Sequence, residues 1–196
     1  YGIDQLRYYL VKEVSLGNDG SISLENLKNC INNDLANNYG NLCQRVFSFI
    51  KKNCENKIPF NSKLNDKDKL LINNLKDNLP KLINFMNNQQ LNEYIKTVVS
   101  FSFDANKYFN DSEPWALKRK NPERMNAILF TIVEQIKNIS ILLNPIIPNA
   151  TNKVFTMINL SDHNISIDKI KDPDALNNNK KIGNLEILFT KIEDDN

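Results

Sequence analysis

Histidine and glycine are scarce in this sequence of 196 residues, which has one histidine and five glycines. A zinc site of the H-E-x-x-H type needs two histidines and a phosphate-cradling loop needs closely spaced glycines, and neither motif is present. His163 lies in a polar stretch, and no plausible Ser/His/Asp set can be assembled around it. We therefore predict that these residues contain no active site, and we interpret His163 as a surface residue.

Cysteine is also rare, and its three copies follow no metal or disulfide pattern. Cys30, Cys43 and Cys54 are odd in number and include no C-x-x-C pair. A structural zinc site or a disulfide framework would need more, and better paired, cysteines or histidines. We predict three reduced thiols, no bound metal and a cytoplasmic location.

The sequence has neither a strong charge of one sign nor a long apolar run. A net charge of +2 and a pI near 8.3 do not by themselves predict nucleic-acid binding, although basic residues can still gather on one face. No apolar run approaches the ~20 residues of a membrane span, so we expect no membrane partner. The start at Tyr1-Gly2-Ile3-Asp4 lacks an initiator methionine and a leader, which favours the middle of a longer chain. Asparagine, by contrast, supplies about one residue in six, which we attribute to an AT-rich genome.

The spacing of the apolar residues predicts an all-α protein. These residues recur at three- and four-residue steps, and glycine is nearly absent after Gly40. The predicted helices run from about residue 3 to 10, 24 to 52, 71 to 86, 91 to 109, 122 to 143 and 148 to 160. Ser23 is an expected N-cap, Asn121-Pro122-Glu123 an expected helix start, and Pro80 should kink its helix. Short links between such helices predict an antiparallel helix bundle.

The length allows one domain of ordinary size with short extensions. We place the helix bundle at residues 23–160, after an N-terminal segment 1–22 and before a C-terminal tail 161–196. The tail ends on an extended apolar stretch from Leu185 to Phe189, which would gain nothing from order in water. We expect it to pack back on the N-terminal segment, beside Ile3, Leu6 and Leu10.

One polar stripe on the long second helix has the side chains of a base-reading surface. Asn37, Asn41 and Arg45 follow each other at four-residue steps, so they project from one face. An amide offers a paired donor and acceptor to a base edge, and a guanidinium offers a forked donor or a plane for stacking. The same pattern also fits an ordinary solvated helix face in an asparagine-rich protein, and the stripe alone does not decide between the two.

The single tryptophan lies in a second candidate region. Pro114-Trp115 follows a loop and precedes Lys118-Arg119-Lys120, with Arg124 and the Lys51-Lys52 pair as further cations. An indole at a helix start beside cations suits base stacking combined with phosphate attraction. The alternative is that Trp115 anchors the loop to the core while the basic residues are merely exposed.

Several motifs occur together and in order along the chain. The first is Tyr1 to Leu10 with Glu13 and Gly17-Asn18-Asp19-Gly20, and the second is Asp34-Leu35-Ala36-Asn37 with Gly40-Asn41-Leu42-x-x-Arg45. The third is Asn106-x-Tyr108 with Glu113-Pro114-Trp115-x-Leu117-Lys118. The fourth runs from Lys181-Ile182-Gly183 to Glu193. Over essentially the whole chain, this combination resembles the methionyl-tRNA synthetases, a group of class I aminoacyl-tRNA synthetases. Asn38-Tyr39 departs from the family pattern, because it is a bulkier pair than usual before the motif glycine, Gly40.

The resemblance implies a fold, a function and a set of site residues. The fold would be the antiparallel helix bundle of the class I synthetase anticodon-binding type. Asn41 and Arg45 would hydrogen-bond bases of the CAU anticodon, Trp115 would stack on the first of them, and Asn37 and Pro114 would support that site. The cations beside Trp115 add, independently of the resemblance, expected phosphate contacts at Lys118, Arg119, Lys120 and Arg124.

The resemblance also implies what lies elsewhere. Residues 1–22 would end the catalytic and stem-contact region that follows the KMSKS loop. ATP, magnesium and the zinc of the family's zinc knuckle would belong to an upstream catalytic domain in the same chain, so no cofactor is expected here. The partners would be the initiator and elongator methionine tRNAs. The end at Asn196 favours an enzyme without a further dimerising tRNA-binding extension.

Two other functions fit the helical pattern. One is a helical interaction scaffold, which predicts an exposed apolar patch. The other is the equivalent bundle of a related class I synthetase for cysteine, leucine, isoleucine or valine, against which the Trp115 motif argues. In every case we expect the isolated chain not to activate methionine.

Overall fold

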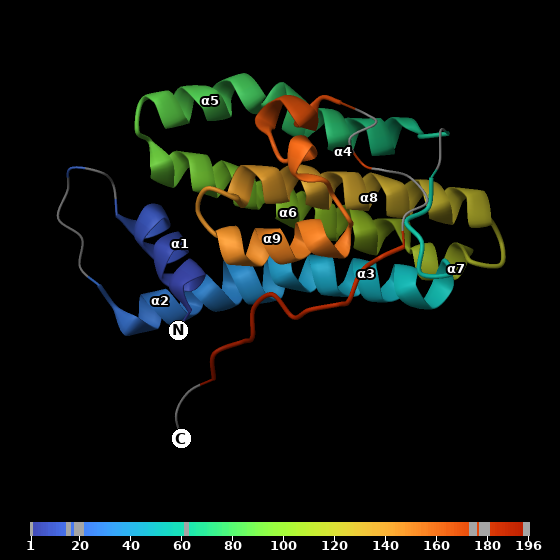
Figure 1. Ribbon diagram of the computed structural model, residues 1–196, viewed down its shortest axis with the longest axis horizontal. Helices are drawn as coiled ribbons and strands as arrows, with labels where there is room; N and C mark the ends of the chain where they lie inside the picture. Colours follow the sequence, from blue (N-terminus) through green and yellow to red (C-terminus); the bar gives the residue numbers. More distant parts are fainter. Residues whose placement is uncertain are drawn as a thin grey trace.

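The computed structural model describes residues 2–14, 17, 22–60, 63–172, 176 and 181–193 and confirms an all-α fold (Figure 1). Long helices lie roughly side by side, and a shorter pair, α1 and α2, sits at one end of the bundle. Within the described residues the only β pairing is an isolated bridge between Lys57 and Lys181. The helices are α1 (Ile3–Glu13), α2 (Leu24–Cys30), η1 (Ile31–Gly40), α3 (Asn41–Asn53), α4 (Asp66–Asp77), α5 (Leu79–Asn87), α6 (Leu91–Ser112), α7 (Pro114–Leu117), α8 (Pro122–Leu143), α9 (Pro148–Met157), η2 (Asp162–Asn164) and η3 (Ile167–Ile170).

The predicted long helix is present as α2, η1 and α3, which follow one another without a break from Leu24 to Asn53. The Ser23 hydroxyl accepts a hydrogen bond from the Asn26 backbone N–H at 3.3 Å, so Ser23 is the expected N-cap. The middle section, Ile31–Gly40, is π-helical, which the apolar spacing did not predict. π-Helical turns are rare and often accompany functional sites.

α8 is the central core helix, and its predicted start and end are confirmed. The Asn121 side chain caps the helix by accepting from the Arg124 backbone N–H at 3.0 Å, and Pro122 occupies the first turn. All residues from Ala127 to Leu143 are buried, and α8 packs against α3, α4, α6, α7 and α9. By length and composition α8 is apolar enough to cross a membrane, but 94% of that stretch is buried inside the bundle.

The helix that contains Pro80 is interrupted completely, where the sequence predicted only a kink. α4 ends at Asp77, Asn78 separates the two elements, and Pro80 lies in the first turn of α5. A proline inside one continuous helix would remove a backbone hydrogen bond and clash with the preceding turn, whereas the first turn tolerates it. The predicted helix over 71–86 is therefore two helices.

The N-terminal helix α1 is tied to the bundle by polar contacts at both of its ends. Arg7 donates to the carbonyl oxygens of Pro145 at 2.7 Å and Ile146 at 2.8 Å. The buried Asp4 carboxylate accepts from the Ala150 N–H at 2.8 Å, in the first turn of α9. At the other end of α1, Lys12 forms a 2.7 Å ion pair with Asp34 of η1. The turn residues 18–20 lie outside the described residues.

The C-terminal tail packs along η1, α3 and the end of α9 rather than on α1. Ile192 exchanges two hydrogen bonds with the Asn32 side chain, at 2.8 and 2.9 Å. Ile182 exchanges two more with Asn56, at 2.8 and 3.1 Å. Phe189, in the apolar stretch between them, is 7% exposed.

The expectation that this tail packs beside α1 is therefore wrong in position. Ile3, Leu6 and Leu10 remain 61%, 38% and 39% exposed. An extended chain needs partners for its backbone as well as for its apolar side chains. Asn32 and Asn56 offer such partners, through the hydrogen bonds to Ile192 and Ile182.

Candidate nucleic-acid interface

The structure brings Arg45 and Trp115 together, although they are far apart in the sequence. The Arg45 guanidinium lies 5.2 Å from the centre of the Phe109 ring. The Trp115 indole meets the same ring edge to face, with 5.8 Å between ring centres and 82° between ring planes. Phe109 is only 2% exposed, so it acts as a fixed platform for both side chains. Neither the stripe nor the tryptophan region predicted this shared platform.

Arg45 is also held by a hydrogen bond. Its Nη2 donates to the Asn110 Oδ1 at 2.7 Å, from α3 to the last turns of α6. A guanidinium has five N–H donors, so this bond leaves others for a ligand. The contacts with Phe109 and Asn110 therefore orient Arg45 without using up its capacity to read a base.

Trp115 is presented to solvent rather than buried in the core. Its side chain is 47% exposed at the second position of the short helix α7. Glu113 precedes α7 with φ of 41°, a left-handed conformation that is unusual for a residue with a side chain. The buried Pro114 then starts α7 immediately, which sets the direction of the indole. This geometry argues against a Trp115 that merely anchors the loop.

The remaining stripe residues flank Arg45 along the same helix. Asn37, on η1, is exposed, and Asn41, the first residue of α3, is half-buried. Gly40 stands between them, where a Cβ atom would lie 2.9 Å from the Leu35 carbonyl oxygen and 3.5 Å from the Phe189 ring. The Leu35 carbonyl oxygen, within η1 itself, therefore requires glycine at this position, whereas the 3.5 Å distance to Phe189 is an ordinary van der Waals contact.

The bulky pair before Gly40 joins η1 to the core. Asn38 is 1% exposed, and its Nδ2 donates to the Ser102 hydroxyl at 3.2 Å. Asn106 Nδ2 in turn donates to Asn38 Oδ1 at 2.9 Å. The fully buried Tyr39 shares a 2.7 Å hydrogen bond between its hydroxyl and that of Ser140. These contacts fix η1 against α6 and α8 immediately before the candidate base-reading residues.

The predicted phosphate contacts divide into two groups. Lys118, Arg119 and Lys120 are exposed at the end of α7, and Lys51 and Lys52 are exposed near the end of α3. Arg124 instead pairs with Asp68, with 2.8 Å between its Nη2 and the Asp68 Oδ1. Its side chain is only 23% exposed, so it is the least accessible of the predicted cations.

The partner of Arg124 is a fully buried carboxylate that joins three helices. Asp68, at the start of α4, also accepts from the Tyr108 hydroxyl of α6 and from the Asn65 backbone N–H at 2.9 Å. Burial acts to raise the pKa of this carboxyl, but the hydrogen bonds from Arg124 and Tyr108 outweigh it, and the pKa falls below its ordinary value. Asp68 thus joins α4 to α6 through Tyr108 and to α8 through Arg124.

Other chemistry finds little support in the described part of the chain. No group of three or more His, Cys, Asp or Glu side chains there is placed to hold a metal ion. Cys30, Cys43 and Cys54 are free thiols in different places, and burial raises the pKa of Cys54 to about 11. A thiol with such a pKa is largely protonated near neutral pH, which argues against a nucleophile.

Comparisons with known proteins match both parts of this site. Residues 58–196, which include Trp115, match the family model described as the anticodon binding domain of methionyl tRNA ligase. Residues 1–47, which include Arg45, match the model described as tRNA synthetases class I (M).

Individual relatives agree with the family models. A methionine–tRNA ligase of Brucella suis is 38% identical over 158 residues, which are 81% of this chain and 31% of that protein. A methionine–tRNA ligase of Rickettsia felis is 31% identical over 100% of this chain and 39% of its own length. The free-state crystal structure of methionyl-tRNA synthetase from Mycobacterium tuberculosis superposes with a TM-score of 0.93 at 27% identity, over 99% of this chain and 40% of that one. The chain thus spans between 31% and 39% of the length of these two ligases.

Proposed function

We propose that this chain, which belongs to the methionyl-tRNA synthetase family, recognises the CAU anticodon of the initiator and elongator methionine tRNAs. The observation that carries the proposal is the convergence of Arg45 and Trp115 on the Phe109 ring, next to a group of exposed cations. An exposed indole provides a stacking surface for an unpaired base, and an oriented guanidinium provides donors for a base edge. Either residue alone is a common surface feature, whereas their fixed juxtaposition suits a single-stranded loop.

Each predicted residue has a role in this proposal. Trp115 stacks on one anticodon base, and Arg45 and Asn41 hydrogen-bond to its neighbours. Asn37 and Pro114 support this arrangement from η1 and from the start of α7. Lys118, Arg119 and Lys120 attract the phosphates, which adds affinity without sequence information.

The chemistry of the enzyme is proposed to lie outside these residues. Activation of methionine requires ATP and magnesium, and the sequence offers no phosphate-cradling loop for them. The exposed apolar side chains of α1 and the adjacent segment, Ile3 at 61%, Ile22 at 65% and Leu24 at 68%, support a contact with a catalytic domain in the same chain. We place the protein in the cytoplasm, where tRNA is charged. Amino-acid-dependent pyrophosphate exchange by the pure chain would contradict this division of labour.

Substitution of Arg45 tests the anticodon proposal. Binding of the chain is measured to a stem-loop with a CAU anticodon and to stem-loops with other anticodons in the same stem. Arg45→Ala should weaken CAU binding by about 1 to 3 kcal/mol and weaken the others less, because it removes a base contact. Arg119→Ala is the matched control and should weaken all of them evenly while reducing the salt dependence. Equal anticodon discrimination by the unaltered chain and by Arg45→Ala would refute base reading by Arg45.

A further inference from the structure

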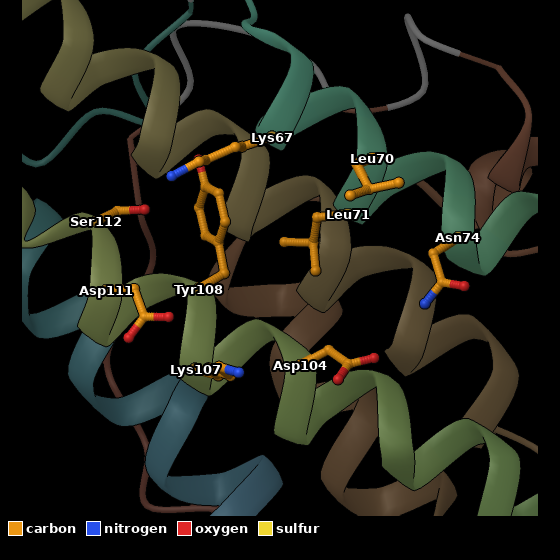
Figure 2. Close-up of a pocket in the computed structure, with 9 residues that line it drawn as sticks. All are labelled: Lys67, Leu70, Leu71, Asn74, Asp104, Lys107, Tyr108, Asp111 and Ser112. Atoms are coloured by element: carbon orange, nitrogen blue, oxygen red, sulfur yellow. The ribbon is translucent and has the colours of Figure 1, made fainter.

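A hollow lies at the end of the bundle where α3, α7 and the start of α8 meet (Figure 1). Its volume is about 620 Å³, larger than that of the α4–α6 cleft shown in Figure 2, which is about 470 Å³. It is open to solvent and none of the five residues predicted for the anticodon site lines it. The hollow is formed by Asn53, Cys54, Glu55, Lys57, Ile58, Pro59, Phe60, Lys118, Pro122, Met125 and Asn126.

Phe60 is the unusual residue of this hollow. It is 56% exposed, although an aromatic side chain normally gains from burial. Its ring packs edge to face on Phe130 of α8, with 6.0 Å between ring centres and 88° between ring planes. A half-exposed ring that packs on a buried one has the properties of a stacking surface.

The charges around Phe60 favour an anionic ligand. Lys57 and Lys118 line the hollow, and Glu55 is its single acidic residue. Glu55 lies 4.0 Å from Lys57 and is 88% exposed, so water weakens its effect on that lysine. The exposed Arg119 and Lys120 follow directly on Lys118. Aromatic surface combined with an excess of cations is the combination that binds bases together with their phosphates.

The α4–α6 cleft lacks this combination. Figure 2 shows Lys67 and Lys107 facing the same cleft as Asp104 and Asp111, so the charges of its lining cancel. This cleft does contain an aromatic ring, that of Tyr108, but the ring is only partly exposed and its hydroxyl is hydrogen-bonded to Asp68. Its most exposed apolar residue is Leu70, which is 71% exposed and has no ring. The two surfaces therefore differ in their balance of charge and in how far their aromatic ring is exposed to solvent.

We propose that the hollow around Phe60 binds a nucleotide of the bound RNA loop that lies outside the three anticodon bases. The base stacks on Phe60, and Lys118 and Lys57 contact the adjacent phosphates. This inference rests on the proposed anticodon recognition, and it extends the path of the RNA strand across the surface of the bundle. Asn53 follows Arg45 by eight residues on α3, a distance of about 12 Å along the helix.

Other cations lie on the way between the two sites. Lys51 and Lys52 are exposed in the last turn of α3, and Lys118 comes directly after α7, the helix that carries Trp115. An RNA strand that leaves the Arg45 and Trp115 site toward this end of the bundle would thus pass these cations before it reaches Phe60.

The test measures binding of a CAU stem-loop to Phe60→Ala. Loss of a stacked base should weaken binding about 5- to 150-fold, and Phe60→Trp should retain most of the affinity. Phe60→Leu keeps an apolar contact with Phe130 but has no aromatic face, so it should bind as weakly as Phe60→Ala. This variant keeps the test valid if the alanine variant is destabilised. Leu70→Ala is the matched control, because it removes an exposed apolar side chain from the other cleft and should leave affinity unchanged.

A second arm identifies the nucleotide. Stem-loops are made with an abasic position at each loop nucleotide outside the anticodon, one at a time. At the nucleotide that Phe60 contacts, Phe60→Ala should cause no further loss of affinity once the base has been removed. At every other loop position, the loss of binding free energy from the missing base and the loss from Phe60→Ala should add. Lys57→Gln, at a lining cation that the anticodon site does not use, should weaken binding and reduce its salt dependence, and Lys67→Gln, in the other cleft, should not.

The outcomes separate the two proposals. Additive losses at every loop position, or equal affinities of Phe60→Ala and the unaltered chain, would overturn the second subsite while leaving anticodon recognition in place. Absence of any preference for CAU by the unaltered chain would overturn the proposed function instead. Failure to bind any stem-loop would overturn both.

Discussion

Replacement of Trp115 by alanine separates a base-stacking residue from a structural one. Truncation of a completely buried tryptophan to alanine costs ~3 to 5 kcal/mol of folding free energy. Trp115 is 47% exposed, so about half of that, or ~1.5 to 2.5 kcal/mol, is the expected loss of folding free energy. In a protein of this size such a loss lowers the melting temperature by roughly 3 to 10 °C. Loss of a stacked base should weaken CAU stem-loop binding by about 1 to 3 kcal/mol, or 5- to 150-fold.

The assay can use the indole itself, because Trp115 is the only tryptophan in the sequence. Saturation of the unaltered chain with CAU stem-loop should change the tryptophan emission, since a stacked base replaces water on the exposed face of the ring. Trp115→Phe should keep part of the affinity, because a smaller ring can still stack. A large loss of stability with unaltered affinity, or an emission spectrum that does not respond to bound RNA, would make Trp115 structural.

Two further predictions concern the stability of the bundle that carries the site. Deletion of residues 181 to 196 should lower the melting temperature, because it removes the hydrogen bonds to Asn32 and Asn56 and uncovers the surface beneath Phe189; an unchanged melting temperature would refute the docking. Asp68→Asn should cost about 3 to 5 kcal/mol of unfolding free energy at pH 7, because Arg124 loses the charge that it pairs with, whereas the exposed Asp104→Asn should cost little. The folded-state pKa of Asp68 is lowered, so its ionisation stabilises the folded state. This contribution to the unfolding free energy is complete above the unfolded-state pKa of ~3.9 and is lost as the pH falls through the folded-state pKa. Unfolding free energies measured with denaturant should therefore differ less between the unaltered chain and Asp68→Asn at pH 3 than at pH 7. The same difference at both pH values would contradict the ion pair.

Local signals in the sequence predicted those parts of the fold that local physics determines. The bounds of α8 follow from the cap at Asn121, from Pro122 in the first turn and from Pro145 just beyond the end. The unbroken run from Leu24 to Asn53 follows from the apolar stripe. The π-helical phase of η1 could not be predicted in this way, because the bonds that anchor it, from Asn38 to Ser102 and Asn106, come from a helix more than 60 residues away.

The same limit applies to the candidate site. Arg45 and Trp115 were singled out from separate stretches, and only the resemblance to a family placed them in one site. Phe109 and Asn110, which hold Arg45 in place, carried no signal of their own. Their position a few residues before Pro114 and Trp115 was the only available hint. Arg124, in contrast, has the sequence context of a phosphate contact, yet Asp68, 56 residues earlier, occupies its guanidinium.

The asparagines show most clearly that composition does not reveal which residues the fold requires. We attributed its abundance to an AT-rich genome, and many exposed asparagines are consistent with that. A side-chain amide, however, carries one donor group and one acceptor, the same pair that a backbone peptide offers. Asn32 uses both on Ile192 of a tail that has no sheet to join, and Asn38 uses both between η1 and α6. At these two positions an apolar residue of similar size would bury unpaired backbone or side-chain groups. An asparagine that the genome supplies and one that the fold requires are identical in the sequence, and only partners more than 60 residues away distinguish them.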